Sequence, residues 1–440
     1  MKKFIQGFLI FIVLYHILVT VIRYGIFGGI NPELPAIIRD CIRLIFIVAI
    51  FIYYFRDLKD YFRQWKRPRI SFIILVIFSV GISYIKGKNV SDMLVGIKYG
   101  FLYIPIFLSA TFIGYIWNEE KSGIMHHASG INNFFQFIKS FLIITLIAGF
   151  FRQVAKFFRP DFFLHIGYGP FNDFVFGAKP PIYYLTGYKG TPRWQGLFSG
   201  PNNYGYFLIA FLPLIVILCK NKIKSLVNRA KDKIAVRNMI VIILRIAAIL
   251  LTLSRSALVG GIVAIALLNF KRIRKNKKIA RGVVGLVMLG LAGLSILKRE
   301  STRIHLTKFL ESISYIIQQP NGYGLGTSGP AIHHNGTLLP ENYFFQLILD
   351  IGTIGFIIRI ISIRQIQIIT RRIKNYFTQI HSETDIQIYR IRIGLTIGRI
   401  ALLIMGFFLH VFEDSMVNYI FFILWGVSTG YLFSQVKDKG

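Results

Sequence analysis

The sequence has few acidic residues and almost no cysteine. Only 19 of its 440 residues are Asp or Glu, and charged residues of both signs make up 16% of the chain, against about 25% in an ordinary soluble protein. Composition this poor in charge excludes a disordered chain, a coiled coil and a typical cytosolic enzyme. The two cysteines, Cys41 and Cys219, show no spacing typical of metal ligands.

Hydrophobic residues take the place of the missing charges. They make up 54% of the chain, which includes 41 Phe and 22 Tyr. One membrane crossing uses about 20 apolar residues, so twelve crossings would use roughly 240, close to the number present. The composition therefore predicts a chain that lies mostly in a membrane, with little left for a soluble domain.

Twelve apolar segments can be found along the chain. They lie near residues 4–22, 37–55, 70–85, 94–116, 134–151, 203–219, 238–253, 257–270, 282–297, 343–361, 393–410 and 417–433. The first follows Met1-Lys2-Lys3, as in a signal peptide, but it is longer than the apolar part of such a peptide and lacks a small-residue cleavage site. We predict an all-α polytopic membrane protein with about 12 transmembrane helices, forming a single membrane domain over residues 1–440.

The basic residues predict the orientation of these spans. Lys and Arg number 52, giving a net charge of +33, which in a soluble protein would indicate a nucleic-acid partner. If the N-terminus is cytoplasmic, half of them fall in four short inner loops at 56–69, 220–237, 271–281 and 362–392. The inner loop near 117–133 is an exception, with Lys121 alone. This is the positive-inside pattern, so we predict cytoplasmic termini and no nucleic-acid partner. Cys41 and Cys219 then lie near opposite faces, which predicts no disulfide.

Two predicted extracytoplasmic loops are long enough to suggest a function. They run over about 152–203 and 298–342, and long loops without their own periodicity are usually functional. In the second, apolar residues recur at helical spacing from Leu306 to Ile317, and Pro320 follows them. We predict a short helix there, lying over the outer face of the membrane.

Two arginines stand at turns beside predicted spans. Arg193 begins Arg-Trp-Gln-Gly, which leads to the turn sequence Gly200-Pro201-Asn202-Asn203, and Arg255 lies in a tight Ser-Arg-Ser turn. Each could simply anchor a helix end at lipid phosphates. A pair of outward-facing guanidinium groups would instead suit a pyrophosphate, which they match bidentately.

Other candidate site residues lie in the second long loop. Gly324 and Gly326 could let backbone N–H groups approach an anion, or the glycine-rich stretch could be a plain flexible loop. Glu341 precedes a span and could take a proton from a hydroxyl, or it could complement the helix dipole. His333 and His334 are alternative bases.

The order of these motifs resembles the O-antigen ligase and polysaccharide polymerase family. An Arg-x-x-Gly turn ending in Pro-Asn, a Ser-Arg turn, a Gly-Tyr-Gly-Leu-Gly stretch, and an acid with Asn before Gly-x-x-Gly follow one another over residues 190–430. The resemblance implies a metal-independent enzyme without cofactors, acting on undecaprenyl-pyrophosphate-linked glycans at the outer face of the bacterial inner membrane. Many ligases have His-Asn where this chain has Glu341-Asn342, and this departure favours a polymerase.

The resemblance also implies roles for individual residues. Arg193 and Arg255 would contact the donor pyrophosphate, with Asn202, Gly324, Gly326 and Asn342 completing the substrate site. The base would be Glu341, His334 or His333, in that order. One direct displacement would invert the anomeric carbon.

Three other functions stay open at this point. A ligase would attach finished polymer to a lipid or protein acceptor. A polysaccharide flippase or transporter could also have twelve spans, although repeated halves are not evident. A non-catalytic membrane scaffold would leave the outer motifs without a role.

Overall fold

The computed structural model describes eleven stretches of the chain and a few isolated residues. They are residues 65–119, 128–166, 168–169, 181–185, 192–198, 200–223, 233–276, 299–329, 338–376, 383–413 and 415–437. Apart from isolated residues, the spans predicted near 4–22, 37–55 and 282–297 lie outside these stretches. His333 and His334 lie outside them too.

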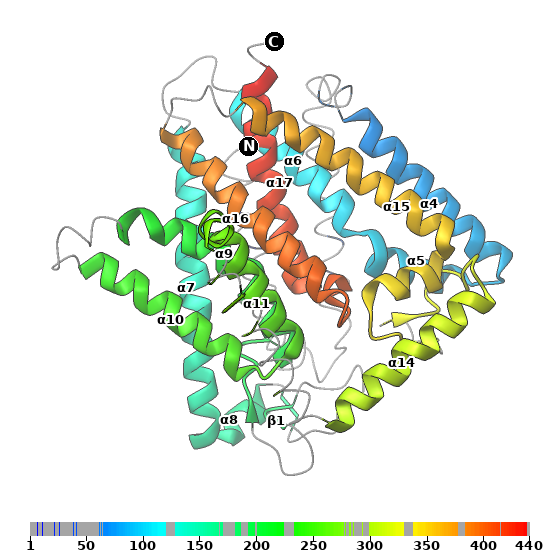
Figure 1. Cartoon of the computed structure of the whole chain (residues 1–440), viewed down its shortest axis with the longest axis horizontal. Coiled ribbons are helices and arrows are strands. Elements are labelled where there is room, and N and C mark those ends of the chain that lie inside the picture. Colours follow the sequence, from blue (N-terminus) through cyan, green and yellow to red (C-terminus); the bar gives the residue numbers. More distant parts are fainter. Residues whose placement is uncertain are drawn as a thin grey trace. The chain divides into compact units, whose positions relative to one another are not determined.

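The described chain is mostly helical and has several helices suited to crossing a membrane (Figure 1). Five are long and apolar enough, and a bent pair of shorter helices could make a sixth. The five are Lys66–Ile85, Asn133–Phe158, Pro201–Cys219, Tyr343–Arg371 and Val417–Gln435. An all-α polytopic membrane protein is therefore confirmed, whereas twelve spans and cytoplasmic termini stay predictions.

The chain divides into two compact units. The elements of the first are α7 (Ala128–Phe158), α8 (Pro160–His165), β1 (Tyr184–Leu185), β2 (Pro192–Arg193), α9 (Pro201–Ile223), α10 (Lys233–Leu251), α11 (Arg255–Leu268), α12 (Phe270–Lys275) and most of α16 (Glu383–Met405). Those of the second are α4 (Lys66–Ile85), α5 (Val90–Phe101), α6 (Tyr103–Glu119), α14 (Arg299–Gln318), α15 (Tyr343–Tyr376), η5 (Val411–Glu413) and α17 (Ser415–Lys437). The helix predicted in the second long loop is thus present as α14.

Helix α9 is the buried centre of the first unit. It packs against α10 and α11, and Gly205 allows close contact, since a Cβ there would lie 2.8 Å from the Ala257 side chain. Pro213 lacks an N–H and interrupts the hydrogen bonds of α9. Before Pro213, the carbonyls of Leu208 and Phe207 accept hydrogen bonds from the buried Arg245 of α10, at 2.9 Å and 3.0 Å. Arg245, a charged residue inside an apolar helix, therefore donates to backbone oxygens of α9.

In the second unit, α6 and α17 pack with their backbones nearly in contact. Gly426 and Gly430 lie four residues apart on α17, and Ala110 and Gly114 have the same spacing on α6. A Cβ added at Gly430 would lie 1.8 Å from the Thr111 oxygen, and one at Gly114 would lie 2.1 Å from the Val427 oxygen. Small residues at this spacing are typical of close helix pairs in membranes, where van der Waals packing replaces the hydrophobic driving force.

Helix α15 is broken at Gly352, which has φ +72°. A helix would pair the Leu349 carbonyl with the N–H of Thr353, but that N–H donates to the Pro320 carbonyl at 2.8 Å. The loop after α14 replaces the missing hydrogen bonds of the helix. The Tyr323 N–H donates to the Leu349 carbonyl at 2.7 Å, and the Gly324 N–H donates to the Asp350 carbonyl at 3.0 Å. The Gly-Tyr-Gly-Leu-Gly and Gly-x-x-Gly motifs are thus partners in one structural unit.

A buried arginine fills the bend between α5 and α6. The two helices meet at 54°, and the Gly100 carbonyl at the bend accepts a hydrogen bond from Arg359 of α15 at 2.8 Å. The same guanidinium donates to the hydroxyls of Tyr103 and Tyr343 and lies over both rings. Arg359 therefore compensates for the break between α5 and α6.

Candidate functional site

A short β-ribbon positions Arg193 in the first unit. β2 pairs antiparallel with β1, so that Arg193 lies opposite Tyr184. The next N–H, that of Trp194, donates to the Leu251 carbonyl at the end of α10 at 3.0 Å, and the Trp194 ring packs on Phe150 at 4.6 Å. These contacts hold the strand against the turn that joins α10 to α11.

The Arg193 guanidinium connects three segments of the first unit. Its Nε donates to the Thr252 carbonyl, just after α10, at 2.9 Å. Its Nη2 donates to the Asn202 side-chain oxygen, in the first turn of α9, also at 2.9 Å. Both acceptors are neutral, so these two bonds orient the positive charge without cancelling it.

The turn that carries Arg255 is fixed by hydroxyl groups. Leu253 has the strained φ of +48°, and Ser254 caps α11 by accepting from the Ala257 N–H. Thr252 accepts from the Ser254 N–H at 3.2 Å and donates to the Ile249 carbonyl at 2.7 Å. The turn places Arg255 at the first position of α11, immediately after the residues that Arg193 contacts.

Arg193 lies close enough to Arg255 for the positive charge of Arg255 to affect it. Burial lowers the pKa of Arg193 to about 10. Tyr184 and Tyr206 oppose this shift, and the positive charge of Arg255 adds to it. Arg193 still keeps its proton at neutral pH. The anion site that the motifs predict at these two arginines stays a prediction.

Arg152 of α7 contacts the segment that follows Arg193, and the sequence did not predict this contact. It donates to the Gly196 carbonyl and lies over the Tyr168 ring at 4.1 Å. Gly196 has φ +53°, and a Cβ there would lie 2.6 Å from the Tyr204 ring. The Arg-x-x-Gly spacing thus has a steric cause. Sequence analysis placed Arg152 at the start of a loop, whereas α7 continues to Phe158.

Glu341 lies in the second unit, at the start of α15, and forms ion pairs with α14. Its carboxylate contacts His305 Nδ1, and the other oxygen lies 3.5 Å from Lys308 Nζ. Burial alone would raise its pKa, but the His305 hydrogen bond and the charges of His305, Lys308 and His410 outweigh burial and lower it. Glu341 is therefore ionised at neutral pH.

These ion pairs predict an acid-dependent loss of stability. A carboxyl group whose pKa is lowered on folding stabilises the protein above the unfolded pKa, and the contribution is lost as pH falls through the folded one. At neutral pH, Glu341→Gln should have a lower thermal midpoint than wild type. As the pH falls below 4.5, the ordinary pKa of a glutamate, the two thermal midpoints should converge. Glu311→Gln, an exposed change on α14, is the control, and a difference that persists at about pH 3 would contradict the assignment.

Sequence comparison adds an independent observation. No family model matches the chain. A curated protein described as "O-antigen polymerase", from Salmonella muenchen, is 20% identical to it over 351 residues, which cover 74% of this chain and 80% of that protein. The chain resembles the O-antigen polymerases.

This resemblance to the O-antigen polymerases agrees with the family expected from the motifs. It supports a membrane enzyme of glycosyltransferase type that takes part in polysaccharide polymerisation. It does not identify the residues of the site, so their roles stay proposals.

Three other residues that the O-antigen polymerase resemblance implicates have structural partners. Asn342 caps α15, accepting from the Phe344 N–H at 2.9 Å and the Phe345 N–H at 3.2 Å. Gly324 and Gly326 have φ of +96° and +79°, and a Cβ would overlap Lys88 at the first and the Asp92 backbone at the second. Their left-handed backbone lets the loop lie close to the start of α5.

Within the stretches that the structure describes, no three His, Cys, Asp or Glu side chains gather as a metal site would require. Metal independence, which the resemblance to O-antigen polymerases implies, stays a prediction.

Proposed function

We propose that the chain is a polymerase of surface-polysaccharide repeat units in the bacterial inner membrane. The donor is a glycan linked to undecaprenyl pyrophosphate, and the acceptor is a hydroxyl of a second lipid-linked unit. The hydrogen bond from Arg193 to the turn that carries Arg255, and the effect of the Arg255 charge on Arg193, are the observations that support this proposal. The active site lies on the extracytoplasmic face, as the positive-inside pattern predicts.

The arginine pair acts on the leaving group. The acceptor oxygen attacks the anomeric carbon, a new C–O bond forms, and the bond from that carbon to the pyrophosphate breaks. Negative charge grows on the departing pyrophosphate, so fixed guanidinium groups stabilise the transition state more than the bound donor. Asn202 and the Thr252 carbonyl keep Arg193 aimed, so little reorganisation accompanies the reaction. One displacement inverts the anomeric carbon, and the arginines supply the charge that a metal would otherwise provide.

Glu341 is the first candidate for the base. Its ionised state at neutral pH supports this role, because a carboxylate can accept the proton of the attacking hydroxyl. His305, which sequence analysis did not single out, holds the carboxylate and could relay the proton. His334 and His333 stay the second and third candidates.

Glycan analysis of a deletion strain tests the function. Loss of the gene should leave single repeat units on undecaprenyl pyrophosphate at the outer face, and a plasmid copy should restore long chains. Full-length polymer stranded on the carrier would instead indicate a ligase. Repeat units retained at the cytoplasmic face would indicate a flippase, and an unchanged glycan profile would refute any role in this synthesis.

A further inference from the structure

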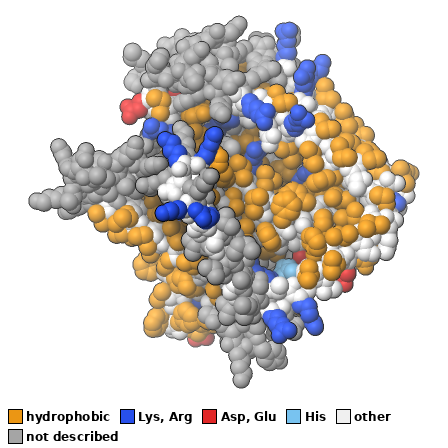
Figure 2. Space-filling view, in the orientation of Figure 1, with side chains coloured by type: hydrophobic (Ala, Val, Ile, Leu, Met, Phe, Trp, Pro, Cys, Tyr) orange, Lys and Arg blue, Asp and Glu red, His pale blue; other side chains and the backbone are white. Residues whose placement is uncertain are grey.

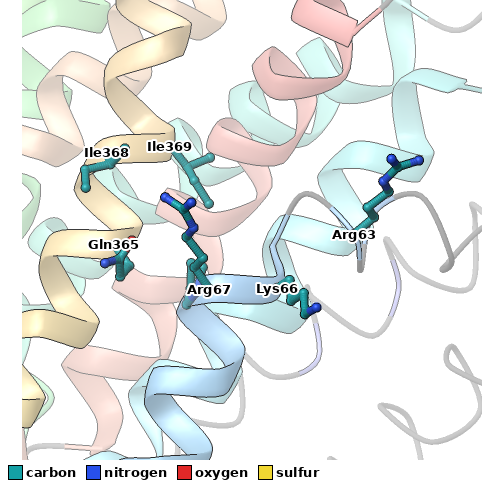
Figure 3. Close-up of a pocket in the computed structure, with 7 residues that line it drawn as sticks. Arg63, Lys66, Arg67, Gln365, Ile368 and Ile369 are labelled. Carbon is teal, nitrogen blue, oxygen red and sulfur yellow. The ribbon is translucent and has the colours of Figure 1, made fainter.

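A basic pocket lies where the start of α4 meets α15, in the second unit. Its volume is about 310 Å³, and it is lined by Arg63, Lys66, Arg67, Pro68, Gln365, Ile368 and Ile369. Arg67 reaches from the start of α4 along α15, beside Gln365 and towards Ile369, whereas Lys66 and Arg63 lie on the side away from α15 (Figure 3). The site proposed for glycan transfer uses none of these residues.

The pocket lies at the positive end of a helix and is lined by basic side chains. The N-terminus of a helix carries a partial positive charge, and its first N–H groups have no partners within the helix. On α4 the first turn has no acidic residue, and Trp65 at the N-cap makes no side-chain capping bond. Three cations line a pocket at this positive end. The positive-inside rule explains why basic residues lie near this helix end, but it does not explain why they line a cavity.

The surface beside the pocket is apolar. Ile70, Ile73 and Ile74 on α4, and Ile361 and Ile368 on α15, are all more than a third exposed. Figure 2 shows hydrophobic side chains over the area occupied by α4 and α15, with Lys and Arg side chains near its upper edge. A ligand bound here would meet cations at one end and hydrocarbon along the rest of its length.

The geometry points to a binding site for the head group of an anionic phospholipid. The phosphodiester would lie beside Arg67 and accept from Gln365, with Lys66 and Arg63 on the side away from α15, while the acyl chains would follow the exposed isoleucines of α4 and α15. The loops that flank the pocket are predicted to be cytoplasmic, where anionic lipids meet basic residues between helices. The site is separate from glycan transfer, and its test requires no donor.

Native mass spectrometry of the full-length protein in detergent can test this site. Phosphatidylglycerol is the anionic probe, phosphatidylethanolamine the zwitterionic one, and inorganic phosphate the soluble one. The variant Lys66→Gln/Arg67→Gln removes two cations that are both exposed, and Arg371→Gln removes an exposed cation of α15 outside the pocket. Arg67→Lys keeps the charge and serves as a second variant.

The site predicts a selective loss of one lipid. The affinity for phosphatidylglycerol should be the same in wild type and in Arg371→Gln. In the double variant it should fall by about fivefold for each cation removed. Arg67→Lys should retain most of the binding. Equal binding by the double variant, or an equal loss in Arg371→Gln, would overturn the site. The site would also be overturned if wild type bound phosphatidylethanolamine as well as phosphatidylglycerol. Binding of inorganic phosphate but not of phosphatidylglycerol would overturn it too.

Discussion

Replacing either Arg193 or Arg255 by alanine should reduce glycan elongation by at least about 100-fold, the usual effect of removing one preorganised donor from a developing negative charge. The donor pyrophosphate gains charge as its bond to the sugar breaks, and each variant leaves one guanidinium to meet that charge. The measurement is the length distribution of the polysaccharide in a deletion strain that carries each variant. Membrane levels of each variant should match those of wild type.

Three further variants separate charge from structure at this site. Arg159→Ala removes an exposed arginine near α8 and should leave elongation unchanged. Asn202→Ala breaks one bond to Arg193 but keeps both cations, so its loss should be smaller than that of Arg193→Ala. Arg193→Lys keeps the charge without the planar fork and should also be intermediate. Wild-type elongation by both alanine variants of the pair would refute the catalytic assignment.

Adding a single methyl group at Gly430 should strongly destabilise the second unit. The Cβ of Gly430→Ala would lie 1.8 Å from the backbone oxygen of Thr111, a backbone group that cannot rotate away. The helices α6 and α17 would have to separate, and overpacking of this kind typically costs about 1–3 kcal/mol. The thermal midpoint of the purified protein should fall by several degrees, and its level in the membrane should drop.

A second glycine of a membrane helix provides the matched control. A Cβ added at Gly81 of α4 would meet nothing within 4 Å. Gly81→Ala should therefore leave the midpoint unchanged or raise it, because alanine favours a helix over glycine by up to about 1 kcal/mol. If the two variants behaved alike, close packing of α6 and α17 would not be the cause.

The apolar segments predicted most of the described helices, because length and composition alone determine whether a segment can cross a membrane. They did not predict the breaks. The span predicted near 94–116 is a bent pair, α5 and α6, and α15 is interrupted at Gly352. Both breaks depend on hydrogen bonds from distant residues, namely Arg359 at the first and the 321–324 loop at the second. No local pattern contains that information.

In the candidate site, too, the sequence predicted the features that have a local signal and not those that depend on distant contacts. The Ser-Arg turn and the Pro-Asn turn carry local signals, and both lie where Arg193 can contact them. Arg152 and His305 looked like ordinary loop or helix residues. Their partners, Gly196 and Glu341, lie 44 and 36 positions away and are brought to them only by the fold. A signal was present for Arg152, since a charge beside an apolar span usually has a specific partner.

The dependence of α15 on the preceding loop has a consequence for biosynthesis. When this helix enters the bilayer, the carbonyls of Leu349 and Asp350 lack the donors that an unbroken helix would provide, and each such group costs several kcal/mol in hydrocarbon. The loop that supplies those donors leaves the ribosome first. Tyr323 and Gly324 are therefore already translated when the residues that accept their hydrogen bonds, Leu349 and Asp350, are made.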